Sequence, residues 1–438
     1  MQLQSRFPAS AAVFIGVLAA SISLDAQTRY SITDLGPASS PFSQATGLNN
    51  TGLVTGVAAS ANGFQHAVAW YWGVMTDISR PGLGGLNSAG GGVNQFGQIM
   101  GLAETSSRDP YNENFCGFGT SSQCLTFLWD FGTMTPLPTL GGTNSNYGAI
   151  NNLGEIAGIA ETNRRDPNCR PGPAVNGTGP QVLDFEAVVW GPQAGQIRAL
   201  SPLPGDTVGM GIGINDAGQV VGASGTCANT VLPGFTAAPH AVLWEKDGTV
   251  RSLPGLGGSA PDVTVLGAGS FGCSINNRGV IAGQSTLSDN KTWHPVLWHD
   301  GLIADLGVLP GDAVGIAAGI NDRGDVVGAS VSAPGPATGN PRAYLWRNGV
   351  MTDLNSLIPA DSPLYLLTAF AINNSGEIAG FGVTDAGDLH GFVAKPCHGE
   401  SEGCKSSGAT SNRAEAKLRT PLSEGARKAL LQLGLRGH

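Results

Sequence analysis

The segment Ile275–Gly283, with the sequence INNRGVIAG, carries the pattern that decides the fold. The pattern is Asn-x-x-Gly-x-(Val or Ile)-x-Gly after an aliphatic residue, and it occurs seven times along the chain. The leading asparagine and first glycine of the copies are Asn49 and Gly52, Asn94 and Gly97, Asn151 and Gly154, Asn215 and Gly218, Asn276 and Gly279, Asn321 and Gly324, and Asn373 and Gly376. Agreement at several fixed positions in seven copies indicates an internal repeat.

Each copy predicts a β-hairpin, because asparagine starts a turn by bonding to nearby backbone and the following glycine accepts a left-handed conformation. A third apolar strand ends in a tryptophan in six copies and in Ala394 in the seventh. The six are Trp70, Trp129, Trp190, Trp244, Trp298 and Trp346. A tight turn and a fourth strand follow. Over residues 30–396 each repeat averages about 52 residues, the size of a propeller blade.

The two ends of the repeat region complement each other. The seventh copy stops after its third strand at Lys395-Pro396, and the missing fourth strand occurs near the N-terminus as Ile32–Gly36. A first strand that completes the last blade removes the exposed edge of the sheet. The sequence therefore predicts an all-β, seven-bladed β-propeller of four-stranded antiparallel blades over residues 29–396. An open β-solenoid is the alternative.

The chain termini predict export and a polar tail. Arg6, the apolar run 11–24 and Ala26 are typical of a secretory signal peptide over residues 1–26, and no later apolar stretch is long enough for a transmembrane segment. Residues 397–438 form a polar tail, either solvated or with a short basic helix. The formal net charge of −9 argues against nucleic acid as a partner. We expect a secreted monomer, extracellular or periplasmic.

Seven cysteines in an exported chain predict disulfides. The pairings expected from spacing are Cys116–Cys124, Cys397–Cys404 and, next in order, Cys169–Cys227. Cys273 would then be a buried free thiol. No Cys-x-x-Cys pair or His/Cys cluster is present, so zinc is not expected.

The third predicted strand begins with a histidine segment in four copies. These are His66-Ala67-Val68, His240-Ala241-Val242, His294-Pro295-Val296 and His390-Gly391-Phe392. With the hairpin motif, they resemble the extracellular HAF repeat, named for His-Ala-Phe, over residues 30–396. The resemblance implies export and a repeat architecture and brings no catalytic residues. The four histidines either line a metal or ligand ring or are partly exposed residues at strand entries.

Loop length is concentrated in three blades. From the last motif glycine to the tryptophan position the distances are 14, 28, 32, 22, 15, 18 and 14 residues. In a propeller these connections lie on the face opposite the short hairpin turns, and long loops on a rigid scaffold commonly bind ligands. The long loops of the second, third and fourth blades are therefore the predicted binding surface.

Two of these loops share a motif, Ala-Glu-Thr followed by Arg-Asp-Pro. The candidate ligand-binding residues are Glu104, Arg108 and Asp109 in the first copy, and Glu161, Arg165 and Asp166 in the second. One interpretation is a polar ligand or Ca²⁺ site, since hard cations prefer carboxylate oxygens. The other is a set of ion pairs that brace the loops. Beyond Ca²⁺ no cofactor is expected.

The inner strands, which would line the channel, end at the motif asparagines. The four residues before each motif asparagine include no carboxylate, His, Lys or Arg, so the sequence does not favour a catalytic site along the channel. The first functional hypothesis is a non-enzymatic extracellular binding or scaffold module for a polysaccharide or protein. The alternative is a propeller hydrolase or lyase acting on extracellular polysaccharide, with Glu104, Asp109, Glu161 and Asp166 as the reacting carboxylates.

Overall fold

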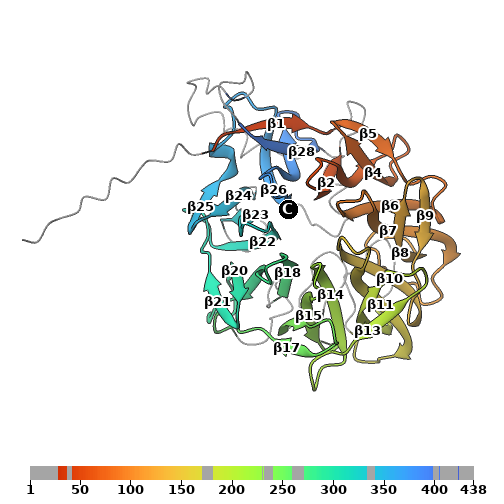
Figure 1. The fold of residues 1–438 in the computed structure, drawn as a ribbon. Coiled ribbons are helices and arrows are strands. Elements are labelled where there is room, and N and C mark those ends of the chain that lie inside the picture. The colour runs from red at the N-terminus through yellow and green to blue at the C-terminus, as the bar shows by residue number, and fades with distance from the viewer. Residues whose placement is uncertain are drawn as a thin grey trace, which may run out of the picture.

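Seven four-stranded antiparallel sheets form a ring around a central channel in the computed structural model (Figure 1). The structure describes residues 28–36, 42–169, 181–228, 230, 240–258, 271–332, 341–397, 404 and 423. The predicted seven-bladed propeller is confirmed, and the β-solenoid alternative is not supported. The predicted signal peptide and most of the predicted tail lie outside the described residues.

The blades follow one another in chain order, with the innermost strand first. Blades 1 to 4 are built from β2 (Ser43–Leu48), β3 (Val54–Ala59), β4 (Gln65–Tyr71) and β5 (Val74–Asp77); β6 (Gly84–Val93), β7 (Ile99–Arg108), β8 (Ser122–Asp130) and β9 (Thr133–Pro136); β10 (Gly141–Ile150), β11 (Ile156–Arg165), β12 (Leu183–Trp190) and β13 (Ile197–Leu200); and β14 (Val208–Ile214), β15 (Val220–Gly225), β16 (His240–Trp244) and β17 (Val250–Ser252).

Blades 5 to 7 complete the ring. They consist of β18 (Phe271–Ile275), β19 (Ile281–Thr286), β20 (Trp293–His299) and β21 (Leu302–Asp305); β22 (Val314–Ile320), β23 (Val326–Val331), β24 (Arg342–Arg347) and β25 (Val350–Asp353); and β26 (Leu364–Ile372), β27 (Ile378–Thr384), β28 (Leu389–Pro396) and β1 (Tyr30–Asp34). A short 3-10 helix, η1 (Leu354–Ser356), follows blade 6.

The N-terminal strand closes the last blade as predicted. β1 pairs antiparallel with β28 from Tyr30 opposite Pro396 to Asp34 opposite Phe392. The Cys397 amide then donates to the Arg29 carbonyl oxygen at 2.8 Å, which continues the pairing past the strand end. Blade 7 therefore joins both ends of the repeat region, and β1 covers the edge of β28 that the seventh repeat alone would leave unpaired.

The motif asparagine builds the predicted hairpin turn. In blade 5, Asn276 Oδ1 accepts hydrogen bonds from the backbone amides of Arg278 at 3.0 Å and Val280 at 2.9 Å. Gly279 sits at φ +77°, and the equivalent glycines of all other copies also have positive φ. The last motif glycine serves packing instead: a Cβ at Gly222 would lie 1.9 Å from the Met210 carbonyl oxygen of the innermost strand.

Four of the six motif tryptophans join consecutive blades. Trp190, Trp244 and Trp298 donate from Nε1 to carbonyl oxygens at the end of the preceding blade, at 2.7–2.8 Å. Trp70 does the same to Leu35 at 3.1 Å, after the strand that completes blade 7. These four side chains are almost fully buried, so each contributes both apolar burial and a directed contact between blades.

The disulfides follow the expected pairing. Cys116–Cys124, Cys169–Cys227 and Cys397–Cys404 are bonded, and Cys273 is free. Cys169–Cys227 joins the loops of blades 3 and 4. Within the residues that the structure describes, no helix is long and apolar enough to cross a membrane.

Candidate functional sites

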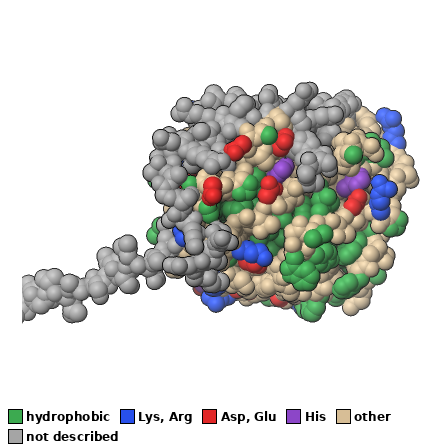
Figure 2. All heavy atoms as spheres, turned by 90° about the horizontal axis from the view of Figure 1, so that it is seen from above, with side chains coloured by type: hydrophobic (Ala, Val, Ile, Leu, Met, Phe, Trp, Pro, Cys, Tyr) green, Lys and Arg blue, Asp and Glu red, His purple; other side chains and the backbone are tan. Residues whose placement is uncertain are grey.

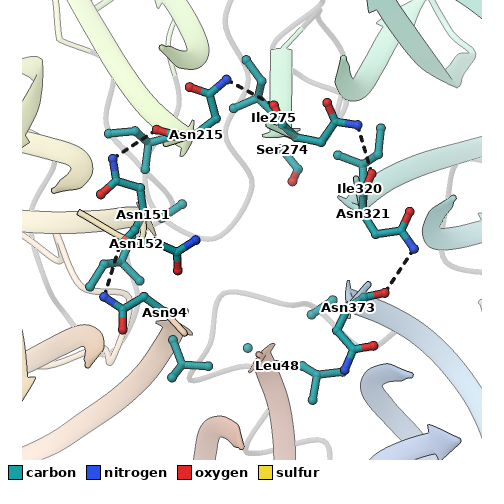
Figure 3. Close-up of a pocket in the computed structure, with 18 of the residues that line it drawn as sticks. Leu48, Asn94, Asn151, Asn152, Asn215, Ser274, Ile275, Ile320, Asn321 and Asn373 are labelled. Atoms are coloured by element: carbon teal, nitrogen blue, oxygen red, sulfur yellow. Dashed lines mark hydrogen bonds between the residues drawn. The ribbon is translucent and has the colours of Figure 1, made fainter. Parts of the chain in front are cut away.

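A closed ring of hydrogen bonds surrounds one mouth of the channel, and Figure 3 shows the part of it that runs from Asn94 to Asn373. Each motif asparagine donates from Nδ2 to the carbonyl oxygen of the motif asparagine in the next blade, at 3.0–3.2 Å. The last step runs from Asn373 back to Asn49 at 3.1 Å. The same side chain therefore makes the turn within its own blade and the link to its neighbour.

A second ring lies beside the first and was not predicted. The residue after each motif asparagine accepts, through its side-chain oxygen, from the backbone amide of the same position in the preceding blade at 2.8–3.0 Å. These residues are Asn50, Gln95, Asn152, Asp216, Asn277, Asp322 and Asn374. Only Asn, Asp and Gln occur there, so the signal was present in the sequence.

The channel holds a cavity of about 360 Å³ bordered by these rings. Its walls are mostly small and apolar residues, as the sequence predicts. The ionisable side chains among its lining are Asp216, Asp322, Cys273 and Tyr147. Burial raises the pKa of Cys273 to about 12 and that of Tyr147 to about 12, so neither ionises near neutral pH. A thiol kept protonated is a poor nucleophile.

The four histidines of the HAF-like segments lie in four different blades, each beside an aspartate. His66, His294 and His390 contact Asp77, Asp305 and Asp34 at 2.9–3.0 Å, which ties the third strand of each blade to the end of the fourth. His240 contacts Asp206 at 2.9 Å. Figure 2 shows histidines beside acidic side chains on the side of the ring it displays.

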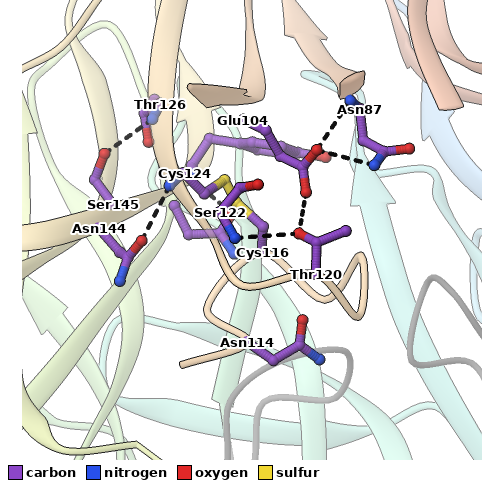
Figure 4. Close-up of a disulfide and its surroundings, with 12 residues drawn as sticks. Asn87, Glu104, Asn114, Cys116, Thr120, Ser122, Cys124, Thr126, Asn144 and Ser145 are labelled. Atoms are coloured by element: carbon purple, nitrogen blue, oxygen red, sulfur yellow. Dashed lines mark hydrogen bonds between the residues drawn. A yellow bond between two sulfur atoms is a disulfide. The ribbon is translucent and has the colours of Figure 1, made fainter. Parts of the chain in front are cut away.

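Glu104 is buried beneath the loop of blade 2 (Figure 4). One carboxylate oxygen accepts from the backbone amide of Asn87 at 3.1 Å and from Asn87 Nδ2 at 2.9 Å, and the other accepts from Thr120. Asn87 Oδ1 in turn accepts from the Gln65 amide of blade 1 at 3.1 Å. The glutamate therefore orients an asparagine that links two blades.

Glu161 repeats this arrangement in blade 3 and is fully buried. Its Oε2 accepts from the backbone amides of Thr143 at 3.1 Å and Asn144 at 2.8 Å, and its Oε1 accepts from Gln181 at 2.9 Å. Asn144 Oδ1 accepts from the Cys124 amide of blade 2 at 3.0 Å. The two Ala-Glu-Thr segments thus have the same structural contacts in neighbouring blades.

Asp109 lies close to Glu161 and shares two hydrogen-bond donors with it. Asp109 Oδ1 accepts from Thr143 Oγ1 at 2.7 Å and from Asn144 Nδ2 at 3.2 Å, and both donors also contact Glu161. Asp109 Oδ2 accepts from the Glu113 amide at 2.8 Å. Its partners are uncharged, so hydrogen bonds rather than ion pairs fix this part of the loop.

Glu113 completes the buried network and was missed in the sequence. It accepts from the Leu183 amide of blade 3 at 3.0 Å and is hydrogen-bonded to Glu161. Burial first, and the nearby Glu161 charge second, raise the pKa of Glu113 to about 9. Burial also raises the pKa of Glu161. We call Glu104, Asp109, Glu113, Asn144 and Glu161 the loop network.

The arginines of the two loops lie away from these carboxylates. Arg108 donates to Asn112 Oδ1 at 3.4 Å, and Arg165 stacks over the Tyr111 ring at 4.8 Å from its centroid. Asp166 lies beside Asp184, with ligand-type atoms of both within 4.8 Å of Cys169 and Cys227. The cysteines are disulfide-bonded and offer no thiolate, which leaves two carboxylates. A Ca²⁺ site here stays a prediction.

No model of a known protein family and no curated protein matches the chain. Solved β-propellers overlap it weakly. The propeller domain of the Trilobed protease from Pyrococcus furiosus is 10% identical, with 84% of this chain and 100% of that chain covered and a TM-score of 0.47. The Pyrococcus horikoshii acylaminoacyl peptidase is 12% identical, with 82% of this chain and 52% of that chain covered and a TM-score of 0.46. This chain therefore spans about half of that protein. The Aleuria aurantia lectin is 12% identical, with 87% of this chain and 100% of that chain covered and a TM-score of 0.34. Overlaps this weak assign no activity or ligand.

Proposed function

We propose that the protein is a non-enzymatic extracellular binding module that uses the long loops of blades 2 to 4. The observation that carries the proposal is the bracing of these loops to one another. Asp109 and Glu113 of the blade 2 loop accept hydrogen bonds from blade 3, and Cys169–Cys227 joins blade 3 to blade 4. A preorganised surface loses less entropy when it binds.

The exposed groups on this braced surface indicate the chemistry of the ligand. Arg108, Arg164 and Arg165 are exposed, and Tyr111 lies under the Arg165 guanidinium. Arginine and tyrosine are common anchors of binding surfaces because they combine directional hydrogen bonds with large contact area. A polysaccharide or protein of the extracellular space fits this surface. Export is supported by the three disulfides, and membership of the HAF-repeat family stays a prediction.

The alternative, a hydrolase or lyase acting on extracellular polysaccharide, has less support from the site. Three of its four candidate carboxylates, Glu104, Asp109 and Glu161, are at most 2% exposed and accept hydrogen bonds from the surrounding protein. A general acid or base must come within hydrogen-bond reach of the substrate. Asp166 alone is partly exposed.

The test is retention of the protein on insoluble polysaccharides and cell envelopes, with and without chelator, while released sugars are measured. Retention without products is expected. Arg108→Ala/Arg165→Ala should reduce retention at least tenfold, whereas Arg198→Ala, an exposed arginine of β13, should leave it unchanged. Released sugars would overturn the non-enzymatic proposal. Loss of retention with chelator would support Ca²⁺ as a component of the site.

A further inference from the structure

The end of the ring opposite the long loops of blades 2 to 4 carries two unusual hairpin turns. This end, the turn face, is formed by the turns between the first and second and between the third and fourth strands of each blade. Trp72-Gly73 joins β4 to β5 in blade 1, and Phe131-Gly132 joins β8 to β9 in blade 2. Both residues of each pair have positive φ, with Trp72 at 49° and Phe131 at 42°. This is the geometry of a two-residue type I′ turn.

Blades 5 and 6 make the same turn with the residues that favour it. Asp300-Gly301 and Asn348-Gly349 occupy these positions, and Asp300 and Asn348 both have φ 51°. Across the described part of the chain, the non-glycine residues with positive φ are Asn112, Asn290, Asp300, Asn348, Trp72 and Phe131. Asn and Asp tolerate this region, whereas bulky side chains rarely adopt it. The two aromatic residues are therefore costly in their turns.

The same two residues are also costly in water. Trp72 is 89% exposed and Phe131 is 81% exposed. Phe96, in the motif turn of blade 2, is 67% exposed on the same face. Backbone strain and exposed apolar groups concentrate at binding sites. We therefore expect bulky apolar side chains that are strained in their turn and exposed to water to contact a partner.

Charge restricts the partner of this surface. The strands and turns of blades 1 and 2, residues 42–77, 84–105 and 122–136, contain no Lys or Arg. In blades 5 and 6 the motif position equivalent to Phe96 is Arg278 or Arg323. The chain as a whole is acidic. A surface with exposed aromatic rings, amides and acids but no cations does not attract nucleic acid, anionic polysaccharide or anionic lipid.

We propose that Trp72, Phe96 and Phe131 form a stacking site for an uncharged sugar polymer. The C–H face of a pyranose ring is apolar and slightly positive, so it packs on the electron-rich face of an aromatic ring. The hydroxyls at the edge of the sugar can bond to neighbouring polar groups such as Gln95 and Asp130. This site lies on the face opposite the loops of the proposed function and is independent of them.

A second copy of the chain fits the surface less well. Stable protein interfaces bury about 800 Å² per partner around a contiguous apolar core. Here polar groups interrupt the aromatic residues: Gln98 Nε2 donates to Asp130 Oδ2 at 3.3 Å and ties together the two turns of blade 2 that carry Phe96 and Phe131. Separate rings among polar groups suit the separate sugar units of a polymer.

The decisive variant is Trp72→Asn/Phe131→Asn, which copies the turn of blade 6. The thermal midpoint should equal or exceed that of the parent, because Asn favours positive φ and an exposed apolar side chain is removed. Affinity gel electrophoresis in dextran, hydroxyethyl cellulose and galactomannan should show retardation of the parent by at least one polymer and at least tenfold weaker retardation of the variant. Polygalacturonate should retard neither protein.

The control is Leu302→Thr/Val350→Thr, which changes exposed aliphatic residues of the equivalent hairpins in blades 5 and 6. It should bind as the parent does. The proposal is overturned if no neutral polymer retards the parent, or if the Asn variant binds unchanged. A parent dimer that the Asn variant converts to a monomer would instead make this face a self-association surface. Loss of binding only in Arg108→Ala/Arg165→Ala would favour the loop site and sink this one.

Discussion

The asparagine ring at the channel mouth and the loop network of blades 2 and 3 are both made of buried polar side chains. The ring uses one residue type at one position in every blade, and each asparagine donates a hydrogen bond to the carbonyl oxygen of the asparagine in the next blade. The loop network uses carboxyl groups that occur in two blades only and belong to residues far apart in the chain. A residue that recurs at the same position in every blade indicates that the fold requires it. Buried carboxyl groups found in only two blades indicate instead that the loop surface above those blades requires them.

The comparison is tested most strongly by the two disulfides of the loop region. Cys169→Ala/Cys227→Ala opens a separation of 58 residues and should lower the free energy of unfolding by about 4 kcal/mol, since longer closed loops restrict the unfolded chain more. Cys116→Ala/Cys124→Ala opens a separation of 8 residues and should cost about 2.5 kcal/mol. Chemical denaturation measures both. Equal losses would show that chain entropy does not govern the difference.

Glu161→Ala tests whether the network is as essential as its burial implies. The variant leaves the backbone amides of Thr143 and Asn144 without their acceptor and removes one of the acceptors of Asn144 Nδ2, so the free energy of unfolding should fall by about 3 kcal/mol. Urea denaturation checks this. Asn163→Ala, at an exposed position of β11, is the matched control and should change it by less than about 0.5 kcal/mol. A small effect of Glu161→Ala would mean that water replaces the carboxylate.

The ring can be dissected at a single asparagine. Asn276→Ala removes both the turn acceptor and the Nδ2 donor to Asn321, and should cost about 2 kcal/mol. Asn276→Asp keeps the turn acceptor but sets a carboxylate oxygen in place of the donor, facing the Asn321 carbonyl oxygen, so we expect at least about 1 kcal/mol. The difference between the two, measured by thermal unfolding, separates the turn from the link between blades. Identical losses would place all the stabilisation in the link.

The sequence predicts the ring better than it predicts the network. Seven copies of one pattern determine the blade number, and the split repeat at 32–36 and 395–396 determines how the circle closes. The second ring was also within reach, because only Asn, Asp and Gln follow the motif asparagine. Glu113 was not, since its contact with Glu161 spans two blades and follows no period. Its protonation depends on burial, which a local pattern does not report. The carboxylates of the Ala-Glu-Thr segments were noticed, but their uncharged partners Asn87 and Asn144 lie in the strands before them.

Glu113→Gln gives the smallest change in stability at pH 5, and its specific signature is a change in the pH dependence of stability. The pKa of Glu113 rises from 4.5 to about 9 because of burial and the Glu161 charge, so the folded protein holds a proton that the unfolded chain has released. The contribution of this proton to the free energy of unfolding is therefore complete below pH 4.5. It should fall as the pH rises toward about 9, by at most about 1.4 kcal/mol per pH unit. Glutamine keeps the donor of the protonated acid without titrating, so the variant should flatten this slope and match or exceed the parent near pH 8. Urea unfolding at pH 5, 6.5 and 8 gives the slopes. Parallel slopes for parent and variant would show that Glu113 does not hold the proton that the protein takes up on folding.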